Sequence, residues 1–300
     1  MTERLPSAGE PTVATGGLRY RHLVERDALR VTGPEAGKFL QGQLTQDVLT
    51  MDLGAHRWSW LLEPAGRVVA LLRVFHPGEQ EWVLESDPGW GEAVSARLAR
   101  FKLRTKAEIE VMPAKLLCCR GPGWNLDGPL VAEPPWPGVL GVDRLYLDAL
   151  PDAADLLSAS GDDLAGAPAL LEAQRIEAGQ PRMGTEITER TIPAETGIVE
   201  WTVSFTKGCY TGQELVARID SRGNHVPRKM VRLRLEAEVA PGSEMFDADG
   251  TPGVSAAAAG RVTSVGLSPS EGWVGLGYLE RKAGSKVSLL ADGVPVRVIG

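Results

Sequence analysis

The sequence predicts an α+β protein that ends in a small antiparallel β-barrel. Up to about residue 226, apolar runs of strand length are mixed with segments whose apolar residues recur at helical spacing. Such a mixture is typical of helices packed on one face of a mainly antiparallel sheet. From residue 227 to 300, short apolar runs alternate with Gly, Pro and Asp and show almost no helical periodicity, which favours a barrel with strands at 230–235, 260–265, 272–279, 287–290 and 294–299. The polar residues 1–17 are expected to form a flexible tail.

The region 18–226 is expected to hold two α+β units. Thr32-Gly33-Pro34 marks a helix start, because proline is favoured in the first helical turn, and Glu63-Pro64-Ala65-Gly66 is a typical hairpin turn. An amphipathic helix around 94–101 should carry Arg97 on its polar face. The expected strands of the first unit are 29–31, 58–62, 68–75, 82–84 and 109–112; the second unit should contain strands 115–120 and 140–147 and a helix over 167–178.

Composition excludes several functional classes. The net charge of -7 argues against broad, non-specific nucleic-acid binding, and no apolar run approaches the roughly 20 residues that cross a bilayer. The three cysteines contain no C-x-x-C pair, and the four histidines are scattered, so neither a disulfide framework nor a structural zinc site is predicted. We therefore expect a cytoplasmic protein with no membrane partner, no direct nucleic-acid partner and no metal site.

The candidate functional residues lie between Lys207 and Glu214, which we call the signature segment. Alternating residues from Trp201 to Phe205 predict a strand before it, and Thr211 is the expected N-cap of a helix after it. Cys209 would then lie beside a helix N-terminus and close to the charge of Lys207. Both features favour the thiolate, which is the nucleophilic and metal-binding form. The alternative is that Cys209 is a small buried apolar residue.

The signature segment, Lys-Gly-Cys-Tyr-Thr-Gly-Gln-Glu, resembles the motif Lys-Gly-Cys-Phe/Tyr-x-Gly-Gln-Glu of the YgfZ family at every fixed position. That family consists of folate-binding relatives of the glycine-cleavage T-protein, within the aminomethyltransferase superfamily. Residues 29–47 and 175–179 are also similar to blocks of this superfamily, so the resemblance covers nearly all of the chain after residue 18. It implies a T-protein-like ring of ferredoxin-like α+β units and a barrel around a central folate channel.

The resemblance also implies a ligand and a set of site residues. The cofactor would be tetrahydrofolate or a one-carbon derivative, with Glu177 matching the T-protein carboxylate that hydrogen-bonds the pterin. Cys209 and Lys207 would be the catalytic pair. The residues expected to help bind the cofactor are Glu177, Lys207, Tyr210, Gln213 and Glu214. One departure is informative, because Val69 and Ala70 stand where the T-protein has two aspartates, and apolar side chains cannot activate a substrate amine.

The resemblance implies a protein that supports iron–sulfur cluster assembly or repair in client enzymes, with an indirect effect on tRNA modification. Its partners would be those clients or assembly proteins. Cys209 could then act as a redox thiol, an adduct-forming nucleophile or a transient cluster ligand, and the sequence does not choose among these or decide whether there is turnover. A non-catalytic folate-binding scaffold is the main alternative, and a folate-dependent aminomethyltransferase or demethylase is the less favoured one.

Overall fold

The computed structural model describes residues 19–299 except 135, 137, 149–166, 222, 224, 249–256 and 284–287, so the expected N-terminal tail lies outside the described residues. Its first part contains β1 (Tyr20–Thr32), α1 (Ala36–Gln41), β2 (His56–Leu62), β3 (Val68–Gly78), β4 (Glu81–Ser86), α2 (Gly91–Lys102), β5 (Glu108–Arg120), β6 (Val131–Ala132), β7 (Gly141–Leu147), α4 (Ala167–Glu177), η1 (Pro193–Glu195), α5 (Val199–Thr202) and α6 (Gln213–Ser221). The second part contains β8 (Arg228–Leu235), β9 (Glu244–Asp247), β10 (Gly260–Ser268), β11 (Gly272–Glu280), η2 (Arg281–Ala283), β12 (Ser288–Ala291) and β13 (Val294–Ile299). This mixed architecture confirms the predicted fold class.

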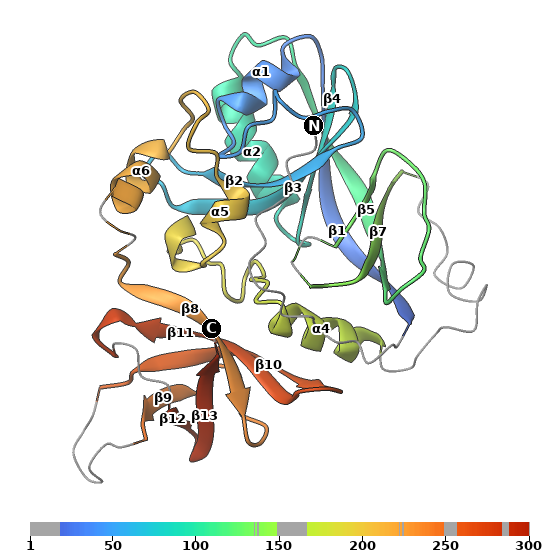
Figure 1. The fold of residues 1–300 in the computed structure, drawn as a ribbon. Helices are drawn as coiled ribbons and strands as arrows, with labels where there is room; N and C mark the ends of the chain where they lie inside the picture. Colours follow the sequence, from blue (N-terminus) through green and yellow to red (C-terminus); the bar gives the residue numbers. More distant parts are fainter. Residues whose placement is uncertain are drawn as a thin grey trace.

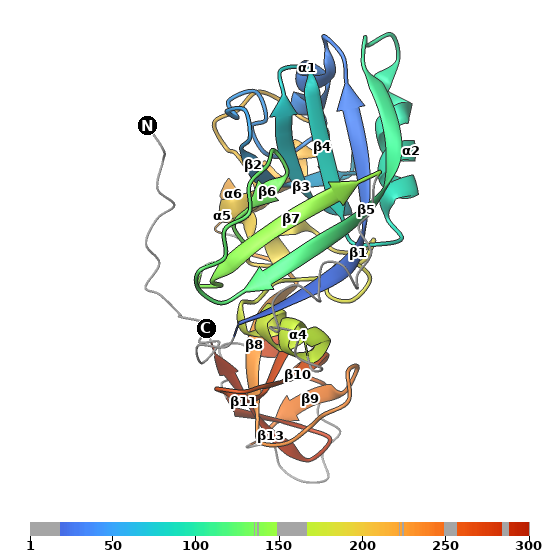
Figure 2. The same ribbon diagram turned by 90° about the vertical axis from the view of Figure 1, so that its right-hand side faces the viewer.

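One sheet of seven strands, in the order β2-β3-β4-β1-β5-β7-β6, joins the strands of both expected α+β units. Its centre is the antiparallel pair of β1 and β5, which runs in unbroken register from Tyr20 opposite Arg120 to Thr32 opposite Glu108 (Figure 2). The sequence suggested two strands separated near Pro113, because proline has no N–H for a ladder. The structure corrects this expectation, since β5 continues through Pro113, with Asp27 opposite.

Two further expectations near the core are wrong. Trp201 to Phe205 is not a strand, because α5 covers its first half and the hydroxyl of Thr202 donates to the carbonyl of Ile198 within that turn. Thr202 is fully buried, and the indole of Trp60 donates to the same hydroxyl at 2.7 Å. Arg97 does not lie on a solvated face of α2: it is 4% exposed and its guanidinium donates twice to the carbonyl of Leu62.

The C-terminal residues form the predicted barrel, closed in the order β10-β11-β8-β13-β12-β9. In Figure 1 the barrel lies below the large sheet, with α4 between the two. Contact with α4 is close: a Cβ on Gly266 of β10 would lie 3.2 Å from the Cα of Ala173. Glu186 also fastens this junction, because its carboxylate accepts hydrogen bonds from Thr263 and Ser264 of β10.

Candidate functional site

A cavity of about 530 Å³ lies between the large sheet and α4. This volume is within the range of sites for small organic ligands. Its walls come from β1, β2, β3, β4, β5 and β7, from Pro134, Trp136 and Val139, and from α4 and the residues after it. The long β1–β5 pair and α4 therefore position most of the site, and the barrel supports α4 from the other side (Figure 1).

A chain of buried ion pairs forms one wall of the cavity. Arg73 donates to Glu85 at 2.7 Å and to Asp143 at 3.0 Å, while Arg26 also pairs with Glu85 and Arg120 with Asp143. Arg73, Glu85 and Asp143 are each at most 1% exposed. Burial acts to raise the pKa of Asp143, but attraction by Arg120 and Arg73 holds that pKa below its usual range. The pairs thus keep these side chains charged inside the protein.

Three N–H donors beside the cavity lack an acceptor in the described part of the chain. They are the indole Nε1 atoms of Trp58 and Trp136 and the amide Nε2 of Gln174. All three side chains line the cavity, and those of Trp136 and Gln174 are about nineteen-twentieths buried, at 4% and 5% exposed. A buried donor without a partner costs about 1–3 kcal/mol, so three around one cavity point to a ligand with several hydrogen-bond acceptors.

The α4 side of the cavity carries a second charged group. Arg175 donates to both carboxylate oxygens of Glu172, at 2.9 and 2.8 Å, and Arg182 donates to Glu172 at 3.1 Å. Burial acts to raise the pKa of Glu172, but the hydrogen bond and charge of Arg175, with Arg182, lower it overall. Glu172 is therefore a carboxylate at neutral pH. Its side chain is 29% exposed, whereas that of Glu85 is fully buried.

Glu177 lies at the end of α4 but is not among the residues that line the cavity. Its backbone carbonyl accepts a hydrogen bond from Arg232 of the barrel. Burial raises the pKa of its carboxyl group, while a hydrogen bond from Ser268 and the charge of Arg234 act in the opposite direction. Its pterin-binding role stays a prediction from the resemblance. The structure brings its side chain near barrel residues rather than near the signature segment.

Lys207 lies in a cage of backbone carbonyls. Its ammonium donates to the carbonyls of Gln41, Leu44 and Gln46, at 2.7, 2.6 and 2.9 Å. It also lies 5.2 Å from the ring centroid of Tyr210. Burial lowers the pKa of Lys207 to about 8, and the nearby charge of Asp47 acts to raise it. The three charge-assisted hydrogen bonds likewise favour the protonated amine.

The rest of the signature segment presents an exposed thiol. Cys209 is a free, exposed cysteine, so the alternative of a small buried residue does not hold for it. The expected capping box is absent, because α6 begins at Gln213 and the hydroxyl of Thr211 points to the carbonyl of Gly42 at 3.4 Å. Instead, the side chain of Gln213 accepts a hydrogen bond from the backbone N–H of Tyr210. Glu214 is exposed on the first turn of α6.

None of the signature residues lines the cavity, so the structure does not bring Lys207, Cys209, Tyr210, Gln213 or Glu214 together with it directly. An aromatic contact chain nevertheless reaches from the cavity towards the segment. The ring of Trp58 lies 5.6 Å from that of Trp136, which lies 5.6 Å from that of Trp201 in α5. Cys118 also lines the cavity, and burial raises the pKa of its thiol to about 12, so it is not a reactive thiolate.

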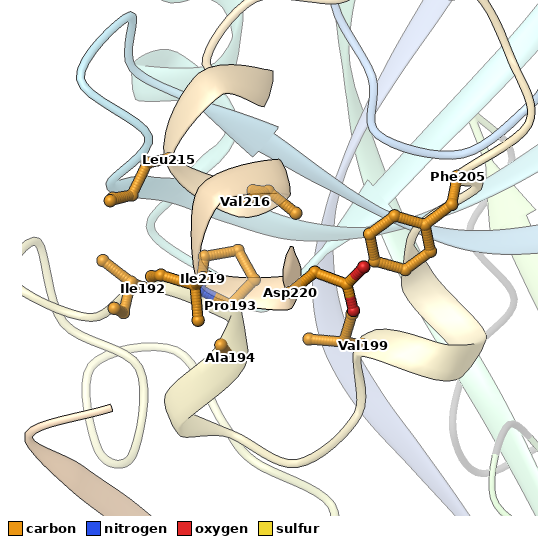
Figure 3. A pocket seen from close by; sticks show the side chains of 9 residues that line it. All are labelled: Ile192, Pro193, Ala194, Val199, Phe205, Leu215, Val216, Ile219 and Asp220. Atoms are coloured by element: carbon orange, nitrogen blue, oxygen red, sulfur yellow. The ribbon is translucent and has the colours of Figure 1, made fainter. Parts of the chain in front are cut away.

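A second hollow adjoins α6 but is too small for a ligand. Leu215, Val216 and Ile219 of α6 face η1 across it, with Phe205 on its far side (Figure 3). Its volume of about 10 Å³ is close to the space of one water molecule. We therefore take the larger cavity and the exposed thiol as the two parts of the candidate site.

Sequence reasoning missed the residues of the cavity itself, chiefly Trp58, Arg73, Trp136 and Gln174. One signal was present, because Arg73 interrupts an otherwise apolar strand, and a charge in such a position is buried only with partners. Its partners could not be inferred, since Asp143 follows 70 residues later in the chain.

The described residues contain neither a candidate membrane-spanning helix nor a grouped set of metal ligands. No helix there is both long and apolar enough to span a membrane. In the same part of the chain, no three His, Cys, Asp or Glu side chains are grouped so that they could hold a metal ion.

Comparisons with known proteins give related sequences and a related fold. The tRNA-modifying protein YgfZ of Pectobacterium carotovorum is 29% identical over 252 residues, which cover 73% of this chain and 72% of that protein. The protein of the same name from Yersinia pestis is 29% identical over 246 residues, 74% of each chain. The crystal structure of the glycine cleavage system aminomethyltransferase T from Bartonella henselae matches with a TM-score of 0.78 and 21% identity, over 96% of this chain and 87% of that one. No protein-family model matches the chain.

Proposed function

Because this chain belongs to the YgfZ family and has the fold of the glycine-cleavage T-protein, we propose that it binds a reduced folate in the cavity between the sheet and α4. The ligand would be tetrahydrofolate or a one-carbon derivative. The observation that carries this proposal is the group of three acceptor-less N–H donors, on Trp58, Trp136 and Gln174, beside a cavity of about 530 Å³.

The residues around the cavity fit such a ligand. The pyrimidinone ring of a reduced pterin is flat and carries oxygen and nitrogen acceptors on its edge, and the indoles of Trp58 and Trp136 supply both aromatic surface and N–H donors. Its pyrimidine edge also carries N–H groups that need a carboxylate acceptor. Five carboxylates line the cavity: Glu25, Glu85, Asp87, Asp143 and Glu172. Glu85 and Asp143 are buried between arginines, Asp87 already accepts from Arg26 and from the backbone N–H of Met183, and Glu25 is 70% exposed beside Lys115. We assign the role to Glu172, whose side chain also pairs with Arg175 and Arg182 but stays 29% exposed.

The second part of the proposal concerns Cys209. Its exposed thiol is available to a macromolecular partner, which supports a role in maintaining iron–sulfur enzymes, with any effect on tRNA modification being indirect. A lone thiolate does not hold a permanent cluster, because such clusters usually need four ligands. The three free cysteines are compatible with the reducing cytoplasm that this role requires.

Aminomethyl transfer is less well supported. Val69 and Ala70 lie in β3 on the positions that the resemblance assigns to two aspartates, and Ala70 is fully buried. Neither side chain can orient or deprotonate an amine. A folate-binding scaffold without chemistry remains the second candidate, and the solvent-exposed Cys209 is the observation that counts against it, because a scaffold needs no thiol there.

Calorimetry with tetrahydrofolate tests the binding site. Trp58→Phe and Trp136→Phe each remove one indole N–H and keep an aromatic ring, so each should weaken binding by about 0.5–1.5 kcal/mol. Trp82→Phe is the matched control, because its indole N–H is also buried without a partner among the described residues but Trp82 does not line the cavity. Wild-type protein that binds no reduced folate, or equal losses in all three variants, would refute the site.

Complementation separates the two functional candidates. In a strain that lacks its own YgfZ, a gene encoding Cys209→Ser should fail to restore iron–sulfur enzyme activity although the variant still binds tetrahydrofolate. Full complementation by Cys209→Ser would favour the scaffold.

A further inference from the structure

We propose that Lys207 is a positioning residue: its ammonium fastens the turn at residues 41–46 to the signature segment and so holds Cys209 at the surface. This inference rests on the proposed role of Cys209, and it replaces the expectation that Lys207 activates the thiol directly. The two segments are far apart in the sequence, since 166 residues separate Lys207 from the first carbonyl that it binds.

The hydrogen-bonding capacity of the ammonium carries the argument. A protonated lysine has three N–H donors and no acceptor. All three are used, because the carbonyls of Gln41, Leu44 and Gln46 lie 2.6–2.9 Å from Nζ. No donor is left for the Sγ atom of Cys209. Gln41 is the last residue of α1, where carbonyls lack partners within the helix, so the ammonium also completes the end of that helix.

The same two segments are joined by further hydrogen bonds on either side of Lys207. The backbone N–H groups of Ser204 and Thr211 donate to the carbonyls of Thr45 and Gly42, each at 3.0 Å. The side chain of Gln46 donates to the carbonyl of Trp201 at 3.2 Å. Lys207 therefore lies in the middle of a seam between the turn and the signature segment. Its removal should loosen the seam on both sides of the thiol.

The space around the thiol shows what the seam leaves open. A Cβ added to Gly208 would meet no heavy atom of the described residues within 4 Å, and Cys209 itself is exposed. Gly208 also has no positive φ, so neither the backbone conformation nor packing within the described chain requires glycine there. The seam thus fixes the signature segment on the side that faces the turn at residues 41–46, and it leaves the opposite side open to a partner.

The test combines hydrogen exchange with alkylation of Cys209, each followed by mass spectrometry. In Lys207→Met, the amides of Ser204 and Thr211 should exchange at least about tenfold faster than in the wild type, because their segment loses its central attachment, while barrel amides keep their rates. The pH midpoint of Cys209 alkylation should move by less than about 0.3 unit, whereas loss of a direct thiolate contact would raise it by about a unit or more. Lys38→Met, on the exposed face of α1, is the control for the change in charge.

Lys207→Arg decides between positioning and charge. Its planar guanidinium keeps the positive charge, but its donors diverge and cannot meet three carbonyls around one atom. We expect this variant to exchange as fast as Lys207→Met and to fail in complementation. Rescue by arginine, or a raised alkylation midpoint in Lys207→Met with unchanged exchange, would overturn the proposal. Global unfolding of both variants would overturn it as well, since Lys207 would then be a general determinant of stability.

Failure of this proposal can be distinguished from failure of the proposed folate binding. Lys207 does not line the cavity, so Lys207→Met should bind tetrahydrofolate within about twofold of the wild-type affinity. A wild type without folate binding would refute the proposed function and leave the exchange result intact.

Discussion

The cavity and the signature segment differ in whether their buried N–H donors have hydrogen-bond acceptors. Beside the cavity, the N–H groups of Trp58, Trp136 and Gln174 have no acceptor among the described residues, whereas each N–H of the Lys207 ammonium is bonded to a carbonyl. An unpaired buried donor destabilises the protein until a ligand or an ordered water supplies an acceptor. A fully bonded loop is complete without one. The difference supports the two proposals made above, that the cavity binds a small molecule and that the signature segment presents Cys209 to a larger partner.

The two regions also differ in how they use charge. In the cavity wall, arginines and carboxylates lie in a row with almost no contact with water, so each depends on its neighbours. Near the thiol, the ammonium of Lys207 is stabilised by three carbonyl dipoles and by the nearby charge of Asp47, and no direct ion pair of Lys207 is found among the described residues. Four changes test this contrast, in order of the expected effect on a free energy of unfolding or binding.

The largest effect should come from Arg73→Met. It leaves Glu85 and Asp143 buried without their shared partner, so the free energy of unfolding should fall by about 3–5 kcal/mol. Urea denaturation measures this. Arg30→Met is the matched control, because Arg30 also lies in the large sheet but its ion pairs are partly exposed, and its loss should cost less than about 1 kcal/mol. Equal losses of unfolding free energy in the two variants would mean that the buried ion pairs stabilise the protein no more than the partly exposed ones.

Acid should weaken the same chain of buried ion pairs. The pKa of Asp143 is lowered in the folded protein. As the pH falls below 3.8, the unfolded chain therefore binds the proton first, and the unfolded state is stabilised relative to the folded state. The stabilisation from Asp143 is therefore present above 3.8 and is lost as the pH falls from there towards the folded-state pKa. Urea midpoints measured from about pH 5 to 2 should fall, and Asp143→Asn should show a shallower fall from a lower starting stability. An identical slope in both proteins would exclude Asp143 as the cause.

A third test sets the two candidate pterin acceptors against each other. Glu172→Gln keeps the shape of the side chain and removes a charged acceptor that lines the cavity, so tetrahydrofolate binding should weaken by about 1.5–3 kcal/mol. Glu177→Gln should change it by less than about 0.5 kcal/mol, since Glu177 is not part of the cavity lining. Calorimetry that gives the reverse order would favour the assignment from the family resemblance and reject ours.

Cys209→Ser should have the smallest effect on stability, below about 0.5 kcal/mol, because the side chain is exposed. The same variant should nevertheless fail in complementation. Urea denaturation of the purified variant measures the change in stability, and complementation in cells measures the loss of function. A large loss of stability would show that the thiol is a packing residue, and the contrast between the two regions would fail.

The sequence by itself determined the features that depend on local pattern. The apolar runs separated by turn residues placed most of the barrel strands, although the short β9 was missed. Helical spacing placed α4, and Gly179, with a φ of +71°, follows its end as expected. The motif around Cys209 located the exposed thiol. Each of these follows from the burial pattern or backbone conformation of neighbouring residues, which the order of residue types records directly.

Only the tertiary structure decided which distant groups meet. That β5 continues through Pro113, that Thr202 is buried under Trp60, and that Glu177 lies outside the cavity all depend on segments packed from elsewhere in the chain. The partners of Lys207 are the clearest case, because backbone carbonyls carry no residue identity and leave no trace in a sequence pattern. The sequence marked Lys207 as important, but its hydrogen bonds, and hence its proposed role, follow from the packing of the turn at residues 41–46 against the signature segment.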